Sequence, residues 1–173
     1  MAASDYILQS EFMHILAALT PLNRLAVEVS LATGMRISDV LELRSGLLKQ
    51  RMCIWERKTG KRKYVHFNKD IFLRMQKMMG RVYVFEGRTD WRKHRTRQAV
   101  YKDIKRAAKL FRIPQKLVIS PHSARKIYAV NAYKRLQNIE KVRDLLNHSS
   151  EAVTIIYAMA DVLTERKIDG KIV

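Results

Sequence analysis

Cysteine, proline, glycine and acidic residues are all scarce in this chain of 173 residues. It has one cysteine (Cys53), three prolines, six glycines, and 16 acidic residues against 34 lysines and arginines. A single cysteine excludes an internal disulfide and a cysteine-built zinc site, and it is typical of a reducing compartment. No apolar run approaches the roughly 18 residues of a membrane span, and the start MAASDYILQS lacks a signal-peptide pattern. We therefore expect a cytoplasmic protein that does not contact a membrane.

Motifs for nucleotide and metal chemistry are missing as well. The sequence contains no GxxxxGK(S/T) loop, no GxGxxG turn and no HExxH helix. We therefore expect neither a cofactor nor a metal ion.

The charge is the strongest compositional signal. The formal net charge of +18 at pH 7 predicts a polyanionic partner, and nucleic acid is the best candidate. Hydrophobic residues make up 47% of the chain, enough to bury a core, and no repeat or Gly/Pro/Ser-rich linker divides it. We expect one domain over residues 1–173.

Helical patterns dominate the chain, and one stretch predicts a β-hairpin. In the segment 51–67, RMCIWERKTGKRKYVHF, apolar residues flank a basic Lys-Thr-Gly-Lys turn. The run RVYVF, residues 81–85, predicts a short edge strand. Helical spacing and capping residues predict helices within 10–19, 20–34, 38–43, 69–80, 98–113, 120–129, 139–146 and 151–163. We expect an α+β fold that is mainly helical with a small antiparallel sheet.

Cations and one tyrosine are the residues best suited to chemistry. A phosphodiester under attack spreads negative charge over its oxygens, and guanidinium groups match that geometry with paired N–H donors. A tyrosine hydroxyl titrates near 10, so it needs a base or a cationic field to act as a nucleophile. A lysine on a hairpin turn can protonate the departing oxygen. The candidate residues are Arg36, Lys58, His122, Arg125, His148 and Tyr157.

The segment SPHSARKIYA, residues 120–129, predicts where an anion binds. Ser120 and Pro121 are typical of a helix start. His122 and Arg125 are three residues apart, so they share one face of the first turn, where backbone N–H groups attract anions. We expect a phosphate to bind there.

Four separated blocks resemble the catalytic domain of the tyrosine recombinases, the phage integrase family. The blocks are ATGMRISDVLEL, RKTGKRKYVHF, HSARKIYA and LLNHSSEAVTIIY. Family members carry Thr-Gly-x-Arg-x-Ser-Glu/Asp, a hairpin lysine, His-x-x-Arg, and Leu-Gly-His with a nucleophilic tyrosine nine residues after that histidine. His148 and Tyr157 have this spacing, since 157 − 148 = 9.

The sequence departs from the family pattern at two positions. Asn147 replaces the usual glycine, and we expect it to adopt the left-handed backbone that asparagine tolerates. Lys126 stands where many members have histidine.

The resemblance implies a reaction. Tyr157 would attack a DNA phosphate to give a 3′-phosphotyrosyl link and a free 5′-hydroxyl, with Arg36, Arg125 and His148 holding the phosphate. The phosphotyrosyl bond would store the energy for rejoining, so no cofactor is implied.

Three further roles follow from the same resemblance. Lys58 would be the general acid, and His122 would take or share the tyrosine proton. Asp39 matches an acidic position that orients the family's site, and it follows Arg36 by three residues.

The resemblance also implies double-stranded DNA as the partner, in a prokaryotic cytoplasm or nucleoid or for a phage-encoded protein. We expect a monomer in solution and a dimer to tetramer on DNA. The family's N-terminal clamp domain is expected to be absent from residues 1–173, and the tail 158–173 either docks on a neighbouring subunit or folds back on its own core. The expected contacts to the DNA backbone are Lys61, Arg62, Arg92, Lys93, Arg95 and Arg97.

Site-specific recombination or integration is therefore the predicted function, and two alternatives remain. A catalytically silent DNA-binding module would keep the basic surface without forming a covalent product. A type IB topoisomerase or telomere resolvase would use the same chemistry to relax or hairpin DNA.

Overall fold

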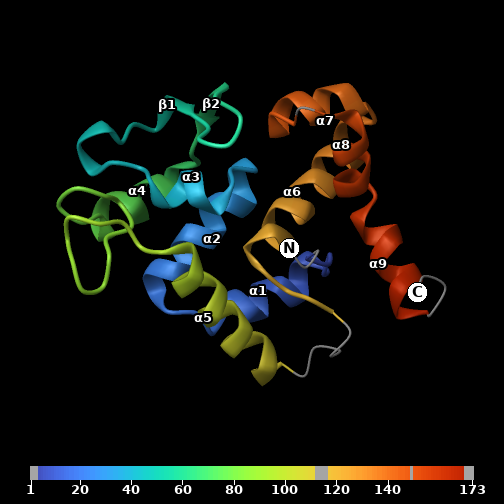
Figure 1. Ribbon diagram of the computed structural model, residues 1–173, viewed down its shortest axis with the longest axis horizontal. Helices are drawn as coiled ribbons and strands as arrows, with labels where there is room; N and C mark the ends of the chain where they lie inside the picture. The colour runs from blue at the N-terminus through green and yellow to red at the C-terminus, as the bar shows by residue number, and fades with distance from the viewer. Residues whose placement is uncertain (1–3, 112–116, 149, 170–173) are drawn as a thin grey trace.

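The computed structural model describes residues 4–111, 117–148 and 150–169, and within them one small sheet lies at the edge of a mainly helical body (Figure 1). The first half contains α1 (Gln9–Ala17), α2 (Pro21–Thr33), α3 (Ile37–Leu41), a 3₁₀ turn (Ser45–Leu47), β1 (Arg51–Trp55), β2 (Arg62–His66) and α4 (Lys69–Met78). The second half contains α5 (Arg97–Leu110), α6 (Pro121–Leu136), α7 (Ile139–Leu146), α8 (Glu151–Ala158) and α9 (Ala160–Ile168).

Helix α6 is the central element. It packs against α2, α5, α7, α8 and α9, and small buried side chains such as Ala124, Ala129 and Ala132 let these helices approach closely. The main core lies between α1, α2, α4, α5 and α6, whereas a smaller cluster joins α6 to α7 and receives Tyr157 at its edge. Tyr157 is therefore held by packing as well as by polar contacts.

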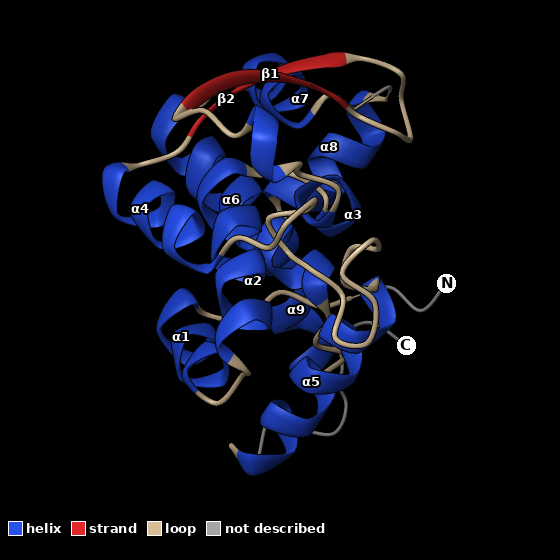
Figure 2. Cartoon of the chain, turned by 90° about the vertical axis from the view of Figure 1, so that its left-hand side faces the viewer, coloured by secondary structure: helices blue, strands red, loops and turns tan. Residues whose placement is uncertain are grey.

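The predicted antiparallel sheet is confirmed. Strands β1 and β2 pair from Arg51↔His66 to Trp55↔Arg62, and the hairpin lies across one end of the helical body (Figure 2). Ile54, Lys63 and Val65 are on its buried face, because alternate side chains of a strand point to opposite sides.

Several predicted turn and capping features are also confirmed. Ser120 is the N-cap of α6 and forms a capping box with Ser123, whose hydroxyl accepts from the Ser120 backbone N–H at 3.3 Å. The Ser120 hydroxyl also accepts from the His122 backbone N–H at 3.2 Å. Gly34 ends α2 in the left-handed conformation with φ = 65°. Asn147 ends α7 with φ = 49°, as expected for a residue in the place of glycine.

The expected edge strand at 81–85 is wrong. Val84 and Phe85 are fully buried, but the segment forms an isolated bridge between Tyr83 and Arg44 instead of a strand. Its backbone hydrogen bonds go to separate loop segments, including one from Val84 N to Leu43 O and one from Arg95 N to Phe85 O. Its apolar run arises from core packing of a loop, which periodicity alone does not distinguish from a strand.

Helix boundaries differ from the prediction in several places. Helix α1 begins at Gln9, so Ser10 lies inside it, and α3 begins at Ile37 because Arg36 is its N-cap residue. The helix expected over 151–163 is interrupted at Met159, and α9 then turns onto α6. Helix α5 ends at Leu110, and residues 112 and 113 of its predicted range lie outside the described residues.

Within the described ranges, every helix is too short or too polar to cross a membrane.

Gly34 provides a stability test. A Cβ there would lie 2.5 Å from the Tyr128 ring, whereas a Cβ on Gly60, which has a similar φ of 62°, would meet no atom within 4 Å. Gly60→Ala should lower the free energy of unfolding by about 1 kcal/mol through backbone strain, and Gly34→Ala by about 1–3 kcal/mol more through overpacking. Urea denaturation measures both values, and equal losses would show that the Tyr128 contact is not tight.

Candidate active site

A pocket of about 700 Å³ opens between the hairpin turn, the start of α3, the first turns of α6 and helix α8. It is also lined by Lys61 and Arg97 from the predicted DNA contacts. All six residues predicted as catalytic line this pocket: Arg36, Lys58, His122, Arg125, His148 and Tyr157. The fold thus gathers side chains from five separate segments of the chain.

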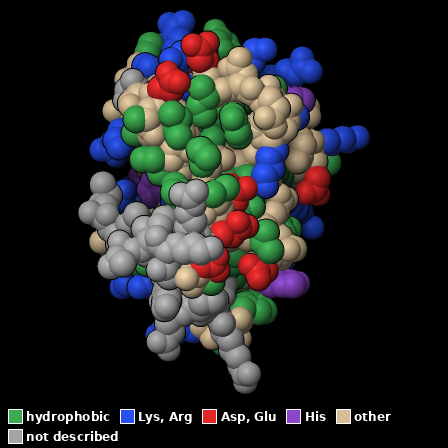
Figure 3. Space-filling model, turned by 90° about the vertical axis from the view of Figure 1, so that its right-hand side faces the viewer, with side chains coloured by type: hydrophobic (Ala, Val, Ile, Leu, Met, Phe, Trp, Pro, Cys, Tyr) green, Lys and Arg blue, Asp and Glu red, His purple; other side chains and the backbone are tan. Residues whose placement is uncertain are grey.

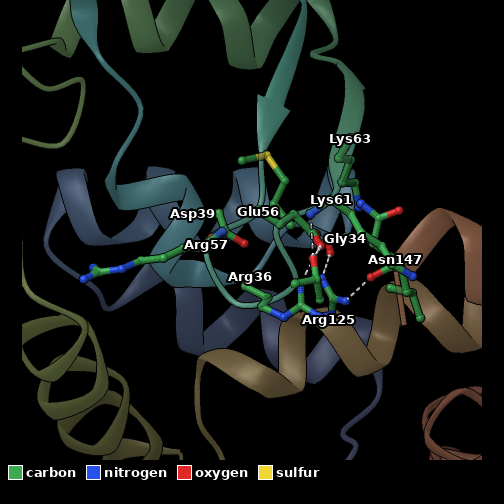
Figure 4. A network of polar contacts seen from close by, with 12 residues as sticks. Gly34, Arg36, Asp39, Glu56, Arg57, Lys61, Lys63, Arg125 and Asn147 are labelled. Atoms are coloured by element: carbon green, nitrogen blue, oxygen red, sulfur yellow. Dashed lines mark hydrogen bonds and ion pairs between the residues drawn. The ribbon is translucent and has the colours of Figure 1, made fainter. Parts of the chain in front are cut away.

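Arg125 forms the floor of the site. Its side chain is 2% exposed, and it donates from Nη1 to the Gly34 carbonyl and from Nη2 to the Leu146 carbonyl (Figure 4). Burial, reinforced by the nearby Arg36, lowers the pKa of Arg125 to about 10. The guanidinium therefore remains charged at neutral pH, and its orientation is fixed in the DNA-free protein.

Arg36 is held by Glu56, which the sequence analysis missed. Arg36 Nη1 lies 2.7 Å from Glu56 Oε2, and Glu56 is only 1% exposed. The same oxygen accepts from the Thr59 hydroxyl at 3.0 Å, and the Glu56 carbonyl accepts from Gly60 N at 2.8 Å. Glu56 thus ties Arg36 to the hairpin turn. The sequence does contain one indication of this role, because Glu56 is the only acidic residue in the otherwise basic hairpin segment 51–67.

Asp39 contacts the backbone beside Lys58. Its Oδ1 accepts from the backbone N–H of Arg57 at 3.3 Å, and burial raises the pKa of its carboxyl group. Its Oδ2 has no hydrogen-bond partner among the described residues. Asp39 therefore supports the base of the turn that presents the exposed Lys58, while the hydrogen bond of Arg36 goes to Glu56.

Tyr157 and His122 face one another. The Tyr157 hydroxyl lies 3.4 Å from His122 Nδ1. Burial raises the pKa of Tyr157 although Arg125 and Arg36 oppose this shift, while burial and Arg125 lower the pKa of His122. Both groups are therefore neutral at pH 7 without DNA. The cationic field alone does not deprotonate the tyrosine, so a nucleophilic role for Tyr157 would need a proton acceptor, and His122 is the group next to its hydroxyl.

His148 is fixed by Thr154, another residue that the sequence analysis did not identify. Its Nδ1 lies 3.1 Å from Thr154 Oγ1, and that hydroxyl donates to the Ser150 carbonyl at 3.2 Å. The threonine proton is thus engaged, so Nδ1 carries the imidazole hydrogen and Nε2 holds a lone pair. Burial, followed by Arg125, lowers the pKa of His148 to about 3. Donation to a phosphate through Nε2 needs a proton there, which the negative charge of a phosphate favours.

The predicted DNA contacts near the hairpin separate into two groups. Lys61 and Arg97 line the pocket. Arg62 lies on the outer face of the sheet, where its guanidinium stacks 4.8 Å from the centre of the Trp55 ring.

The other predicted contacts lie in the loop before α5. Arg92 is exposed and stacks 5.0 Å from the centre of Trp91, and Lys93 is exposed beside Asp90 at 3.4 Å. Arg95 is half-buried, and burial lowers its pKa. Arg92 and Lys93 are therefore more accessible to a DNA backbone than Arg95.

No group of three or more His, Cys, Asp and Glu side chains in the described part of the chain is arranged to hold a metal ion.

Solved structures share this fold. A lambda integrase dimer bound to a COC′ core site aligns with a TM-score of 0.76 and 18% identity, covering 91% of this chain and 49% of that one. The catalytic domain of bacteriophage HP1 integrase aligns with a TM-score of 0.65 and 20% identity, covering 91% and 89%. XerH recombinase bound to palindromic difH substrate aligns with a TM-score of 0.70 and 17% identity, covering 95% and 52%. This chain thus spans about half the length of the lambda integrase chain.

The fold is accordingly that of tyrosine recombinase catalytic domains, as expected from the four sequence blocks. The phage integrase family model matches residues 6–163, and the chain belongs to the phage integrase family. A curated relative, the probable integrase/recombinase YoeC of Bacillus subtilis (strain 168), is 28% identical over 141 residues, which cover 78% of this chain and 75% of that protein.

The low pKa of His148 has a consequence for stability. The folded state holds this pKa near 3, whereas an unfolded chain titrates near 6.5, so the unfolded state binds the proton first as the pH falls. Between pH 7 and pH 5 the wild type should lose about 2 kcal/mol more of its free energy of unfolding than His148→Asn does. Urea denaturation at both pH values measures the difference, and equal losses would show that His148 titrates normally.

Proposed function

We propose that this chain is the catalytic domain of a site-specific DNA recombinase or integrase that cleaves and rejoins DNA through a 3′-phosphotyrosyl intermediate. The observation that carries the proposal is the 3.4 Å approach of Tyr157 to His122 inside a pocket lined by four arginines and two lysines, Arg36, Arg125 and Lys58 among them. Membership of the phage integrase family supports it.

The two arginines would hold the scissile phosphate. Arg125 uses Nη1 and Nη2 to bond two carbonyls, and Arg36 uses Nη1 to bond Glu56. A guanidinium has five N–H donors, so each arginine keeps donors for the phosphate oxygens. Because both groups are already anchored, they would stabilise charge that develops on those oxygens without first reorganising.

The chemical step would move two protons. His122 Nδ1 would accept the proton of the Tyr157 hydroxyl while the phenolate oxygen attacks phosphorus. The bond from phosphorus to the 5′ oxygen would break, and Lys58 would protonate that oxygen to leave a 5′-hydroxyl. Rejoining would reverse these transfers with a 5′-hydroxyl as the nucleophile, so no external energy source enters the cycle.

Double-stranded DNA would lie across the pocket mouth. The hairpin turn presents Lys58 and Lys61 on one side, and Arg97 begins α5 on another. The exposed Arg92 and Lys93 would extend this basic surface along the duplex.

A second surface would hold neighbouring copies on DNA. Apolar side chains gather on the side of the molecule that carries α7, α8 and α9 (Figure 3). The backbone of Tyr6 donates to Thr164 at 3.1 Å and Lys134 pairs with Asp161 at 2.8 Å, so one side of α9 packs on its own chain. We propose that the outward side docks on another copy in a dimer or tetramer. The exposed apolar residues are Val153, Ile155, Ile156, Met159, Val162 and Leu163.

Replacement of the nucleophile tests the proposed function. Wild type should form a covalent adduct on nicked duplexes from a randomised pool, because a nick lets the cleaved fragment diffuse away and prevents rejoining. Tyr157→Phe should bind the same DNA and form no adduct, whereas Tyr133→Phe, a half-buried tyrosine of α6, should keep the adduct. Denaturing gels measure the adduct. Salt-sensitive binding without an adduct from wild type would contradict the proposal and favour a silent module.

The role of Lys58 as the acid is tested by the leaving group. Lys58→Met should cleave ordinary DNA about 10²–10⁴-fold more slowly, since general-acid catalysis is worth that much. A 5′-bridging sulfur needs no proton to depart, so such a substrate should restore most of the rate. Persistent loss with the sulfur substrate would mean that another group is the acid. Single-turnover cleavage of the sites recovered from the randomised pool provides the rates.

A further inference from the structure

Lys63 is a buried lysine with no role in the chemistry proposed above. It lies on the inner face of β2 beside Val65 and is only 8% exposed. Its Nζ donates to the Leu145 carbonyl at 2.7 Å. Burial, followed by the charge of Arg125, lowers the pKa of Lys63 to about 8. A methionine would fill the same space without burying a charge, so the ammonium group calls for an explanation.

The charged groups that face Lys63 do not by themselves explain why a lysine is buried here. Arg125 and Arg36 repel it, while Glu56 and Asp39 attract it. Both carboxylates already accept other hydrogen bonds: Glu56 accepts from Arg36 and Asp39 from the backbone of Arg57. Lys63 donates its hydrogen bond to the backbone carbonyl of Leu145 instead. The position of Leu145 in the fold therefore indicates what the lysine does.

That carbonyl belongs to the C-terminal turn of α7, where backbone groups carry partial negative charge and attract cations. Three successive residues are tied there: Leu145 to Lys63, Leu146 to Arg125, and Asn147, whose Nδ2 donates to the Arg62 carbonyl at 3.0 Å. Figure 4 shows Lys63 descending from the sheet toward this turn, with Arg125 and Asn147 beside it.

The two ends of this connection lead to different parts of the active site. Strand β2 follows the turn that carries Lys58, and His148 follows the end of α7 by two residues. Strand β2 is held to α7 by its Lys63 side chain and by its Arg62 carbonyl. The hairpin is a two-stranded sheet, which has little stability of its own and needs such support.

We propose that Lys63 is a positioning residue that fixes the hairpin to the end of α7 and thereby sets the place of Lys58 relative to the phosphate-binding groups. The effect on DNA cleavage rests on the proposed function, whereas the connection between β2 and α7 does not. Lys63 acts through Lys58 and contacts no reacting atom.

Cleavage kinetics test the consequence for Lys58. Lys63→Met removes the donor and keeps the apolar stem, and it should slow cleavage of ordinary DNA about tenfold because small misplacements of a catalytic group are costly. The loss should largely disappear with a 5′-bridging sulfur, whose departure needs no acid. Lys63→Arg, which keeps the charge and donors, should recover part of the rate. Lys49→Met, at an exposed lysine just before β1, should leave cleavage unchanged.

Unfolding and hydrogen exchange separate positioning from general stability. Lys63→Met should unfold at the same or a higher urea concentration than wild type, since it removes a buried charge. Amide exchange should nevertheless accelerate in β2 and in the last turn of α7, and Lys49→Met should accelerate neither.

Three results would overturn the proposal. Unchanged exchange in both segments would show that Lys63 does not connect them, even if the wild type never cleaved DNA. Unchanged cleavage would show that the connection does not position Lys58. An equal loss of cleavage rate on ordinary DNA and on the 5′-bridging-sulfur substrate would show that Lys63 acts through a group other than Lys58. Failure of the wild type to form an adduct would instead contradict the proposed function, while the exchange measurement would still decide whether the connection exists.

Discussion

The buried guanidinium of Arg125 is the contact on which the active site depends. It bonds the Gly34 carbonyl at the end of α2 and the Leu146 carbonyl at the end of α7. Each of these ends is followed two residues later by a site residue, Arg36 in one case and His148 in the other. Because helix C-termini carry partial negative charge, they partly stabilise the buried cation. A single side chain of the central helix α6 thus fixes the backbone segments that carry Arg36 and His148.

The DNA-free site is rich in positive charge that has no matching negative charge. Glu56 neutralises part of the charge of Arg36, and burial keeps His122, His148 and Tyr157 neutral. A bound phosphate would add the negative charge that this arrangement lacks. It would accept charge-assisted hydrogen bonds from the arginines and would favour protonation of His148. The same excess of cations extends over the whole chain, with its net charge of +18. Association with a polyanion and stabilisation of a reacting phosphate, as proposed above, would therefore have the same electrostatic origin.

Sequence patterns predicted the features that depend on local chemistry. The hairpin, the start of α6 at Ser120 and the left-handed backbone of Asn147 follow from residues within a few positions of each other. The gathering of the six site residues was predicted through the resemblance to a family. Glu56 and Lys63 escaped prediction because their partners are remote in sequence and a charged residue on a hairpin is ordinarily exposed. The prediction of a strand at 81–85 was wrong because a buried loop can have the same run of apolar residues as a buried strand.

The most direct test of the central claim is to identify the amino acid that becomes linked to DNA. The adduct from nicked duplexes would be digested with nuclease and trypsin, and the peptides would be sequenced by mass spectrometry. The account predicts a nucleotide joined through its 3′-phosphate to Tyr157, which is the only tyrosine in the tryptic peptide spanning residues 144–166. A nucleotide on any other residue, or a link through a 5′-phosphate, would contradict it.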